Sequence, residues 1–79
     1  MNDSSLEPGR SERPLSASEA AVLGYLPTNL TAAEIAGEMF VSVHTVKSHM
    51  RHIYSKMGVH RRSEAVNRGR QLGLLPPLH

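Results

Sequence analysis

The sequence predicts an all-α fold of four helices in one small domain. Its apolar residues recur at steps of three and four, capping residues precede the periodic segments, and no segment alternates as a strand does. With 79 residues and no cysteine, the chain can form one small core but neither a disulfide framework nor a thiolate zinc site. The folded part is predicted at residues 15–75, after a disordered lead-in at 1–14 and before a tail at 76–79.

Two capping boxes predict the first two helices. Ser16 and Glu19 open a helix that Pro27 ends, and Thr31 and Glu34 open a shorter one that ends near position 39. The spacing of apolar residues predicts which side of each helix enters the core. The expected core positions are Ala20, Val22, Leu23 and Leu26 in the first helix and Leu30, Ile35, Ala36 and Met39 in the second.

Cap and stop residues also set the third and fourth helices. Ser42 is placed to cap a longer helix over residues 43–57, which Gly58 ends. A fourth helix begins near Ser63 and stops at Gly73. The expected core positions are Val43, Val46, Met50, Ile53, Tyr54 and Met57 in the third helix and Ala65, Val66, Gly69 and Leu72 in the fourth.

Charge is divided unevenly along the chain, although the net charge is only +2. Residues 1–42 carry two basic and six acidic side chains, and residues 43–79 carry seven basic and one acidic, so the net charge changes from −4 to +6. All five histidines also lie in the second part. Such asymmetry indicates a polyanionic partner, nucleic acid first and an anionic membrane surface second, or simply a solvated basic face.

The third predicted helix carries a polar stripe opposite its apolar one. This basic stripe contains no acidic residue, whereas an ordinary solvated helix gains from Glu–Lys pairs four residues apart. A short helix, the tight connection Phe40–Val41 and a longer basic helix together fit a DNA major groove. The stripe consists of His44, Lys47, Ser48, Arg51 and Ser55, flanked by Thr45, His49, His52 and Lys56.

Individual positions on this helix predict different contacts. Lys47 and Arg51 lie one turn apart and reach the same groove, and arginine discriminates guanine from a wrong base by about 1–3 kcal/mol. Ser48 supplies a short contact between them, whereas Thr45 and His49 are rotated toward the phosphates. We therefore expect substitution of Arg51 by alanine to relax base preference.

The pair Arg61-Arg62 precedes the fourth helix, where two cations oppose the helix dipole. A DNA phosphate bound by the free amides and both guanidinium groups would reverse this cost. Pairing of one arginine with Glu64 explains the pair equally well. In the first case, substitution of Arg62 by alanine weakens binding to every DNA sequence alike.

Other chemistries find less support. His49 and His52 lie three residues apart with His44 upstream, but no cysteine or suitably placed carboxylate completes a four-ligand metal site, so no metal and no cofactor is expected. Pairs such as Ser48 and His52 lack a third orienting acid, so no enzyme activity is predicted. Membrane-surface binding would need a spare apolar face edged by aromatic residues, and the chain has one Phe and no Trp.

The residues also resemble a known family. Leu15-Ser16-x-x-Glu19, Leu30-Thr31-x-x-Glu34-Ile35-Ala36 and Phe40-Val41-Ser42-x-x-Thr45-Val46-Lys47-x-His49 are similar to the LuxR-type (GerE-like) helix-turn-helix of bacterial transcription regulators, and matches continue to about residue 75. The resemblance implies a winged-helix-like three-helical core without a wing, plus a fourth helix. The link at 27–31 is most similar to the large ATP-dependent, MalT-like branch.

The resemblance further implies a C-terminal effector domain in the bacterial cytoplasm, attached to an upstream regulatory domain. It would bind double-stranded DNA as a homodimer on inverted-repeat or tandem sites; the alternative is a protein-interaction module of the same fold with weak or no specific DNA binding. The expected contacts are Lys47, Ser48 and Arg51 to bases, Thr31, Ser42, His44, Thr45, His49, Lys56, Arg61 and Arg62 to the DNA backbone, and Ala65, Val66, Gly69 and Arg70 to the second copy.

Overall fold

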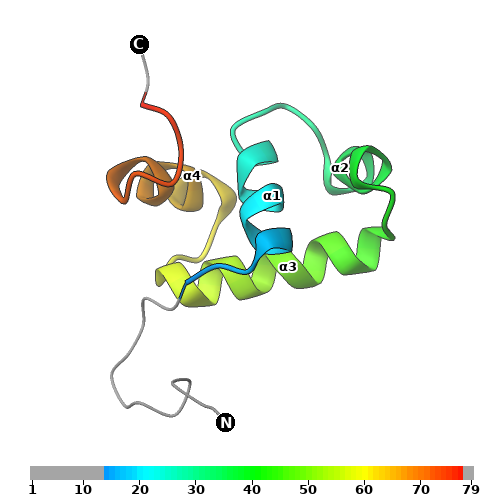
Figure 1. The fold of residues 1–79 in the computed structure, drawn as a ribbon, viewed down its shortest axis with the longest axis horizontal. Helices are drawn as coiled ribbons and strands as arrows, with labels where there is room; N and C mark the ends of the chain where they lie inside the picture. The colour runs from blue at the N-terminus through cyan, green and yellow to red at the C-terminus, as the bar shows by residue number, and fades with distance from the viewer. Residues whose placement is uncertain (1–13, 78–79) are drawn as a thin grey trace, which may run out of the picture.

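The computed structural model describes residues 14–77, and within this range it contains four helices and no strand (Figure 1). The predicted all-α fold is therefore confirmed. The lead-in predicted at 1–14 lies outside the described residues except for Pro14, as do residues 78–79 of the tail. The helices are α1 (Ala17–Tyr25), α2 (Ala32–Met39), α3 (Val43–Met57) and α4 (Arg62–Gln71).

The longest helix, α3, organises the domain. It contacts each of the other three helices, and α1 lies across it between α2 and α4 (Figure 1). Helix α1 also packs against α4. The buried side chains of all four helices meet in one apolar core, which consists of Val22, Leu23, Leu26, Ile35, Ala36, Val46, Ile53, Met57, Ala65, Val66 and Leu75.

Both predicted capping boxes are present. At the start of α1, the Ser16 hydroxyl accepts the Glu19 amide at 3.1 Å, and the Ser16 amide donates to the Glu19 carboxylate at 2.9 Å. At α2 the corresponding distances between Thr31 and Glu34 are 3.1 and 2.8 Å. Each box satisfies two backbone amides that have no partner within the helix, so these local signals fix where both helices begin.

The last helix lies where it was predicted. Helix α4 begins at Arg62, next to Ser63, although its N-cap residue Arg61 makes no side-chain cap hydrogen bond. After α4 the chain reverses at Gly73, whose φ of 76° is left-handed, and the Leu75 amide donates to the Gly69 carbonyl. This reversal returns a tail residue to the core.

Three residues expected in the core are exposed instead. Val43 is 37% exposed because it is the first residue of α3, and Leu72 is 44% exposed because it follows the last turn of α4. Ala20 lies on the outer side of α1. Their place is partly taken by Leu75, which is 7% exposed and packs over Gly69, where an added Cβ would lie 2.8 Å from a Leu75 methyl carbon.

The connection from α2 to α3 is as short as the sequence predicts. Phe40 caps the end of α2 in a left-handed conformation with φ of 59°, and the Val41 amide donates to the Ala36 carbonyl. The Ser42 hydroxyl then accepts the amide of Thr45 at 3.0 Å and begins α3. This tight turn sets α3 directly after α2, as a helix-turn-helix requires.

Replacement of Phe40 by glycine is expected to stabilise the domain by about 1 kcal/mol, which corresponds to a rise in Tm of about 4–8 °C. A side chain in the left-handed region is strained, and the Phe40 side chain is 94% exposed, so its removal forfeits little packing. Thermal unfolding followed by circular dichroism measures the change. Phe40→Ala is the control: it keeps a Cβ and should gain much less, and an equal gain in both variants would mean that strain is not the cause.

Candidate nucleic-acid interface

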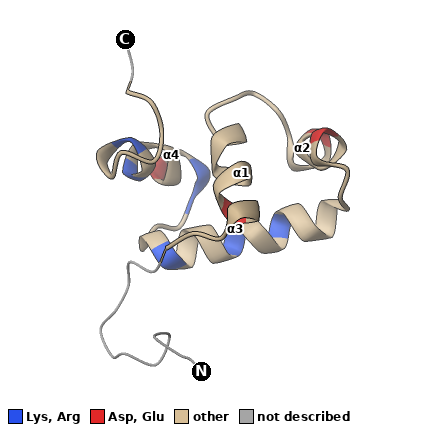
Figure 2. Cartoon of the chain, in the orientation of Figure 1, with Lys and Arg blue, Asp and Glu red and all other residues tan. Residues whose placement is uncertain are grey.

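The outward side of α3 presents the predicted base-contacting residues together. Lys47 and Arg51 are exposed, Ser48 is half-buried between them, and an Arg51 guanidinium nitrogen donates to the Ser48 hydroxyl at 3.2 Å. Figure 2 shows basic residues along α3 with no acidic residue in the helix. The face therefore offers hydrogen-bond donors on a rigid helix, within reach of one groove.

The hydroxyl residues around the turn act as helix caps. The Thr31 hydroxyl accepts a backbone amide at the start of α2, and the Ser42 and Thr45 hydroxyls lie 2.9 Å apart at the start of α3. Thr31 and Ser42 are exposed, and Thr45 is half-buried. A hydroxyl that accepts an amide still has a proton to donate. One proton of the Ser42–Thr45 pair is used between the two hydroxyls, so the other proton of the pair and that of Thr31 remain able to contact a phosphate. His44 is exposed beside them.

Lys56 has a partner that the sequence did not indicate. Its ammonium lies 2.6 Å from the Glu19 carboxylate and 3.3 Å from the Pro14 carbonyl oxygen, and its side chain is only 17% exposed. Burial raises the pKa of Glu19, but the Lys56 ammonium and the Ser16 amide together lower it more, so the pKa lies below its ordinary value. Lys56 thus joins α3 to the start of α1, which removes the main support for its use as a phosphate contact.

Arg62 also turns inward. Its partners are neither a DNA phosphate nor Glu64, the two that the sequence suggested. Its guanidinium donates to the carbonyl oxygens of Leu26 at 3.0 Å, Thr28 at 3.0 Å and Tyr25 at 3.4 Å, at the end of α1. Arg61 stays outside: its guanidinium lies 3.9 Å from the Glu64 carboxylate, and both side chains are exposed. Of the two arginines, Arg61 is the one available to an external anion.

His49 differs from the prediction that it points toward phosphates. It is half-buried, and its Nδ1 is buried without a hydrogen-bond partner among the described residues. The fold brings His49 and His52 of α3 close to Glu19 of α1. Glu19 could not be assigned to these histidines from the sequence, because it is distant from them along the chain and its predicted role was to cap α1.

The residues predicted to contact a second copy are mostly core residues. Ala65 is fully buried, Val66 is 9% exposed, and Gly69 is covered by Leu75. At these three positions the apolar side of α4 packs against the rest of its own chain. Arg70 is half-buried at the edge of this packing.

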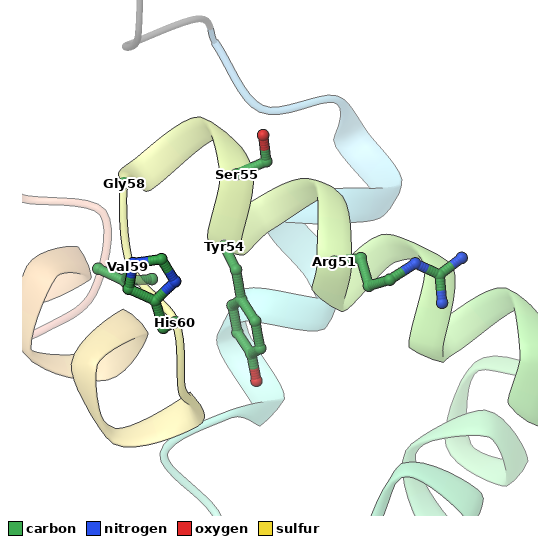
Figure 3. Close-up of a pocket in the computed structure, with 6 residues that line it drawn as sticks. All are labelled: Arg51, Tyr54, Ser55, Gly58, Val59 and His60. Atoms are coloured by element: carbon green, nitrogen blue, oxygen red, sulfur yellow. The ribbon is translucent and has the colours of Figure 1, made fainter.

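An open groove of about 560 Å³ adjoins the basic face (Figure 3). Tyr54 lies in it between Arg51 and His60, and Ser55, Gly58 and Val59 complete its lining. Burial raises the pKa of the Tyr54 phenol against the opposing effect of Arg62, so the hydroxyl stays protonated and able to donate. The groove extends the donor surface of α3 toward the start of α4.

A basic helix set behind a tight turn defines a helix-turn-helix domain of the regulatory class. The chain belongs to the LuxR family of bacterial regulatory proteins. Its residues 13–68 match the GerE family, which is described as bacterial regulatory proteins of the luxR family. The family is one of DNA-binding domains of transcription regulators. Within residues 14–77, none of the helices is long and apolar enough to cross a membrane.

Individual relatives agree with this assignment. The chain is 45% identical over 62 residues to the HTH-type transcriptional activator RamA of Corynebacterium glutamicum, and 42% identical over 59 residues to the HTH-type transcriptional regulator MalT of Serratia proteamaculans. These matches cover 78% and 75% of this chain but 22% and 6% of the relatives. The chain therefore spans less than a quarter of the length of either relative.

A solved structure matches equally well. The crystal structure of the response regulator ChrA, from a heme-sensing two-component system, superposes with a TM-score of 0.75 at 42% identity and covers 78% of this chain and 31% of ChrA. A MalT protein is among these relatives, and RamA and ChrA match to a similar degree.

Proposed function

We propose that this chain binds double-stranded DNA in a sequence-specific manner, with α3 in the major groove, as the effector domain of a bacterial transcriptional regulator. One observation carries the proposal: the exposed cations of α3, Lys47 and Arg51, lie on one outward face, whereas Lys56 of the same helix is paired internally. A helix that exposes cations on one face only is suited to a single polyanionic surface.

The proposed contacts follow from exposure and from the partners already described. Lys47, Ser48 and Arg51 contact bases. Phosphate contacts surround them at both ends of α3. The residues that offer a donor group there are Thr31, Ser42, His44, Thr45 and Arg61. Each phosphate neutralised makes the logarithm of the affinity fall by about 0.9 per logarithmic unit of salt, so binding should be strongly salt-dependent.

The proposal extends to the whole regulator. An upstream regulatory domain would fit the greater lengths of the relatives. We further propose a location on the nucleoid in the cytoplasm and binding as a homodimer to inverted-repeat or tandem sites. A second copy would meet the outer side of α4, where Asn67 and Gln71 are exposed and Arg70 is half-buried. These positions replace the buried residues first expected there.

The Arg51→Ala variant tests the groove contact. Selection from a random duplex library yields a preferred duplex, and we expect the variant to bind it about 10- to 100-fold more weakly, with a much smaller loss on a scrambled duplex. Arg61→Ala is the matched control, because this exposed cation lies off α3 and should weaken binding to both duplexes by the same factor. Fluorescence anisotropy at fixed salt measures the affinities of the unsubstituted protein and of both variants for each duplex.

Two results would contradict the proposal. Equal losses on both duplexes for Arg51→Ala would remove Arg51 from base recognition. Absence of any gel retardation of a random duplex at low salt would favour the alternative of a protein-interaction module with the same fold.

A further inference from the structure

Helices α1 and α3 bring three metal-ligating side chains together away from the basic face. One ligand atom each of Glu19, His49 and His52 lies within 4.8 Å of the other two. The two histidines are one turn apart on α3, and Glu19 reaches them from α1. A neighbouring cavity of about 220 Å³, lined by Glu19, His52, Ser55 and Lys56, connects the cluster to solvent.

Neither histidine Nδ1 of this cluster donates or accepts a hydrogen bond within the described part of the chain. His49 Nδ1 is buried and has no hydrogen-bond partner among residues 14–77. His52 Nδ1 faces Glu19 Oε2 at 3.7 Å, which is an ion-pair distance when the imidazole is protonated but is too long for a hydrogen bond. Buried polar atoms are nearly always paired, so an unpaired buried nitrogen beside a second free nitrogen and a carboxylate requires an explanation.

We propose that Glu19, His49 and His52 bind a divalent transition-metal ion, with Zn²⁺ as the reference case. Two imidazole nitrogens and one carboxylate oxygen form a ligand set typical of zinc and unlike the all-oxygen sets of Mg²⁺ and Ca²⁺. Ligand atoms around one tetrahedral Zn²⁺ lie roughly 3.4 Å apart, so the distances of up to 4.8 Å in the cluster must shorten by up to about 1.4 Å. His52 is exposed and can rotate to close this gap, and water fills the fourth position.

Lys56 limits the affinity of this cluster for a metal ion. Its ammonium occupies Glu19 Oε1 at 2.6 Å, which leaves Oε2, the oxygen that faces His52, for the ion. Repulsion between the ammonium and a divalent cation weakens binding, so we expect a Kd on the order of micromolar rather than nanomolar. The bound ion would tie α1 to α3 next to the helix that carries Lys47 and Arg51.

Thermal unfolding of the untagged chain with Zn²⁺ tests the site. An ion that binds only the folded state at about 100 times its Kd should raise Tm by about 10 °C, and Co²⁺ should show a visible absorption band when bound. Mg²⁺ at the same concentration should leave Tm unchanged. The probes are the chloride salts of these three metals.

His52→Ala and His60→Ala form a matched pair, because both histidines are exposed and only His52 belongs to the cluster. We expect His52→Ala to lower the Zn²⁺ affinity at least tenfold and His60→Ala to leave it unchanged. No Zn²⁺-dependent rise in the unsubstituted protein, an equal rise with Mg²⁺, or an unchanged affinity in His52→Ala would each overturn the proposal.

Discussion

Substitution of Arg62 by alanine is expected to lower the free energy of unfolding by about 3 kcal/mol. The guanidinium donates to three backbone carbonyl oxygens at the end of α1, and hydrogen bonds to a charged group contribute about 1.5–3 kcal/mol each. Because part of this site is exposed, we expect the loss of stability to stay well below the sum of three such hydrogen bonds. For a domain of this size, the loss corresponds to a fall in Tm of more than about 10 °C.

Urea unfolding of the variant measures this change, and Arg61→Ala is its neighbouring control. The Arg61 side chain is 75% exposed and lies 3.9 Å from Glu64, so its removal should change stability by less than about 0.5 kcal/mol. Arg62→Lys should restore little, because a lysine ammonium cannot reproduce the planar fork of donors. A fully stable Arg62→Ala variant with weakened DNA binding would instead support the phosphate contact that the sequence suggested.

The helix boundaries were predictable because their signals are local. Ser16, Thr31 and Ser42 cap amides three residues ahead, and Gly58 adopts its left-handed conformation at the end of its own helix. The face of α3 was predictable for a related reason: positions three and four apart share a side of any helix. Both the helix boundaries and the exposed face of α3 can therefore be predicted without knowledge of how the helices pack.

The partners of Lys56 and Arg62 could not be inferred in this way. Lys56 meets a carboxylate 37 positions earlier, and Arg62 meets carbonyl oxygens 34 to 37 positions earlier. A count of charges treats both as solvated cations, whereas packing against α1 gives each a specific partner. The packing of α1 against α3 also brings Glu19 next to His49 and His52. From the sequence, Glu19 was assigned only to the capping box with Ser16.

In helix α4 the sequence predicts the apolar side but does not predict what covers it. Periodicity identified Ala65, Val66 and Gly69 as one apolar side, but an apolar side can face its own core or a second copy. The deciding residue is Leu75, which lies beyond the helix and returns over Gly69 only because Gly73 reverses the chain. No spacing within α4 contains that information.

Replacement of Lys56 by methionine is expected to cost about 3–4 kcal/mol, because it leaves a buried carboxylate without its cation. The Glu19 side chain is only 7% exposed, and its remaining hydrogen bond comes from the Ser16 amide. Methionine keeps the length of the lysine stem, so packing changes little. Chemical unfolding at neutral pH should show a variant close to the limit of stability.

The pH dependence and a second substitution show whether the loss of stability in Lys56→Met comes from the lost charge or from changed packing. In the unsubstituted protein the pKa of Glu19 is lowered, so its contribution is present above the ordinary value of 4.5 and is lost as pH falls through the folded pKa. In Lys56→Met, burial instead favours the protonated acid, so the stability difference from the parent should shrink toward pH 4.

Glu19→Gln keeps an oxygen for the Ser16 amide and needs no cation. When combined with Lys56→Met it should recover about 2 kcal/mol, which a double-mutant cycle reports as coupling energy. A loss below about 0.5 kcal/mol in Lys56→Met, with no coupling to Glu19, would mean that Lys56 is held by solvent rather than by the ion pair. Its ammonium would then be free to contact a phosphate, and the cation count of the DNA-facing surface would rise by one.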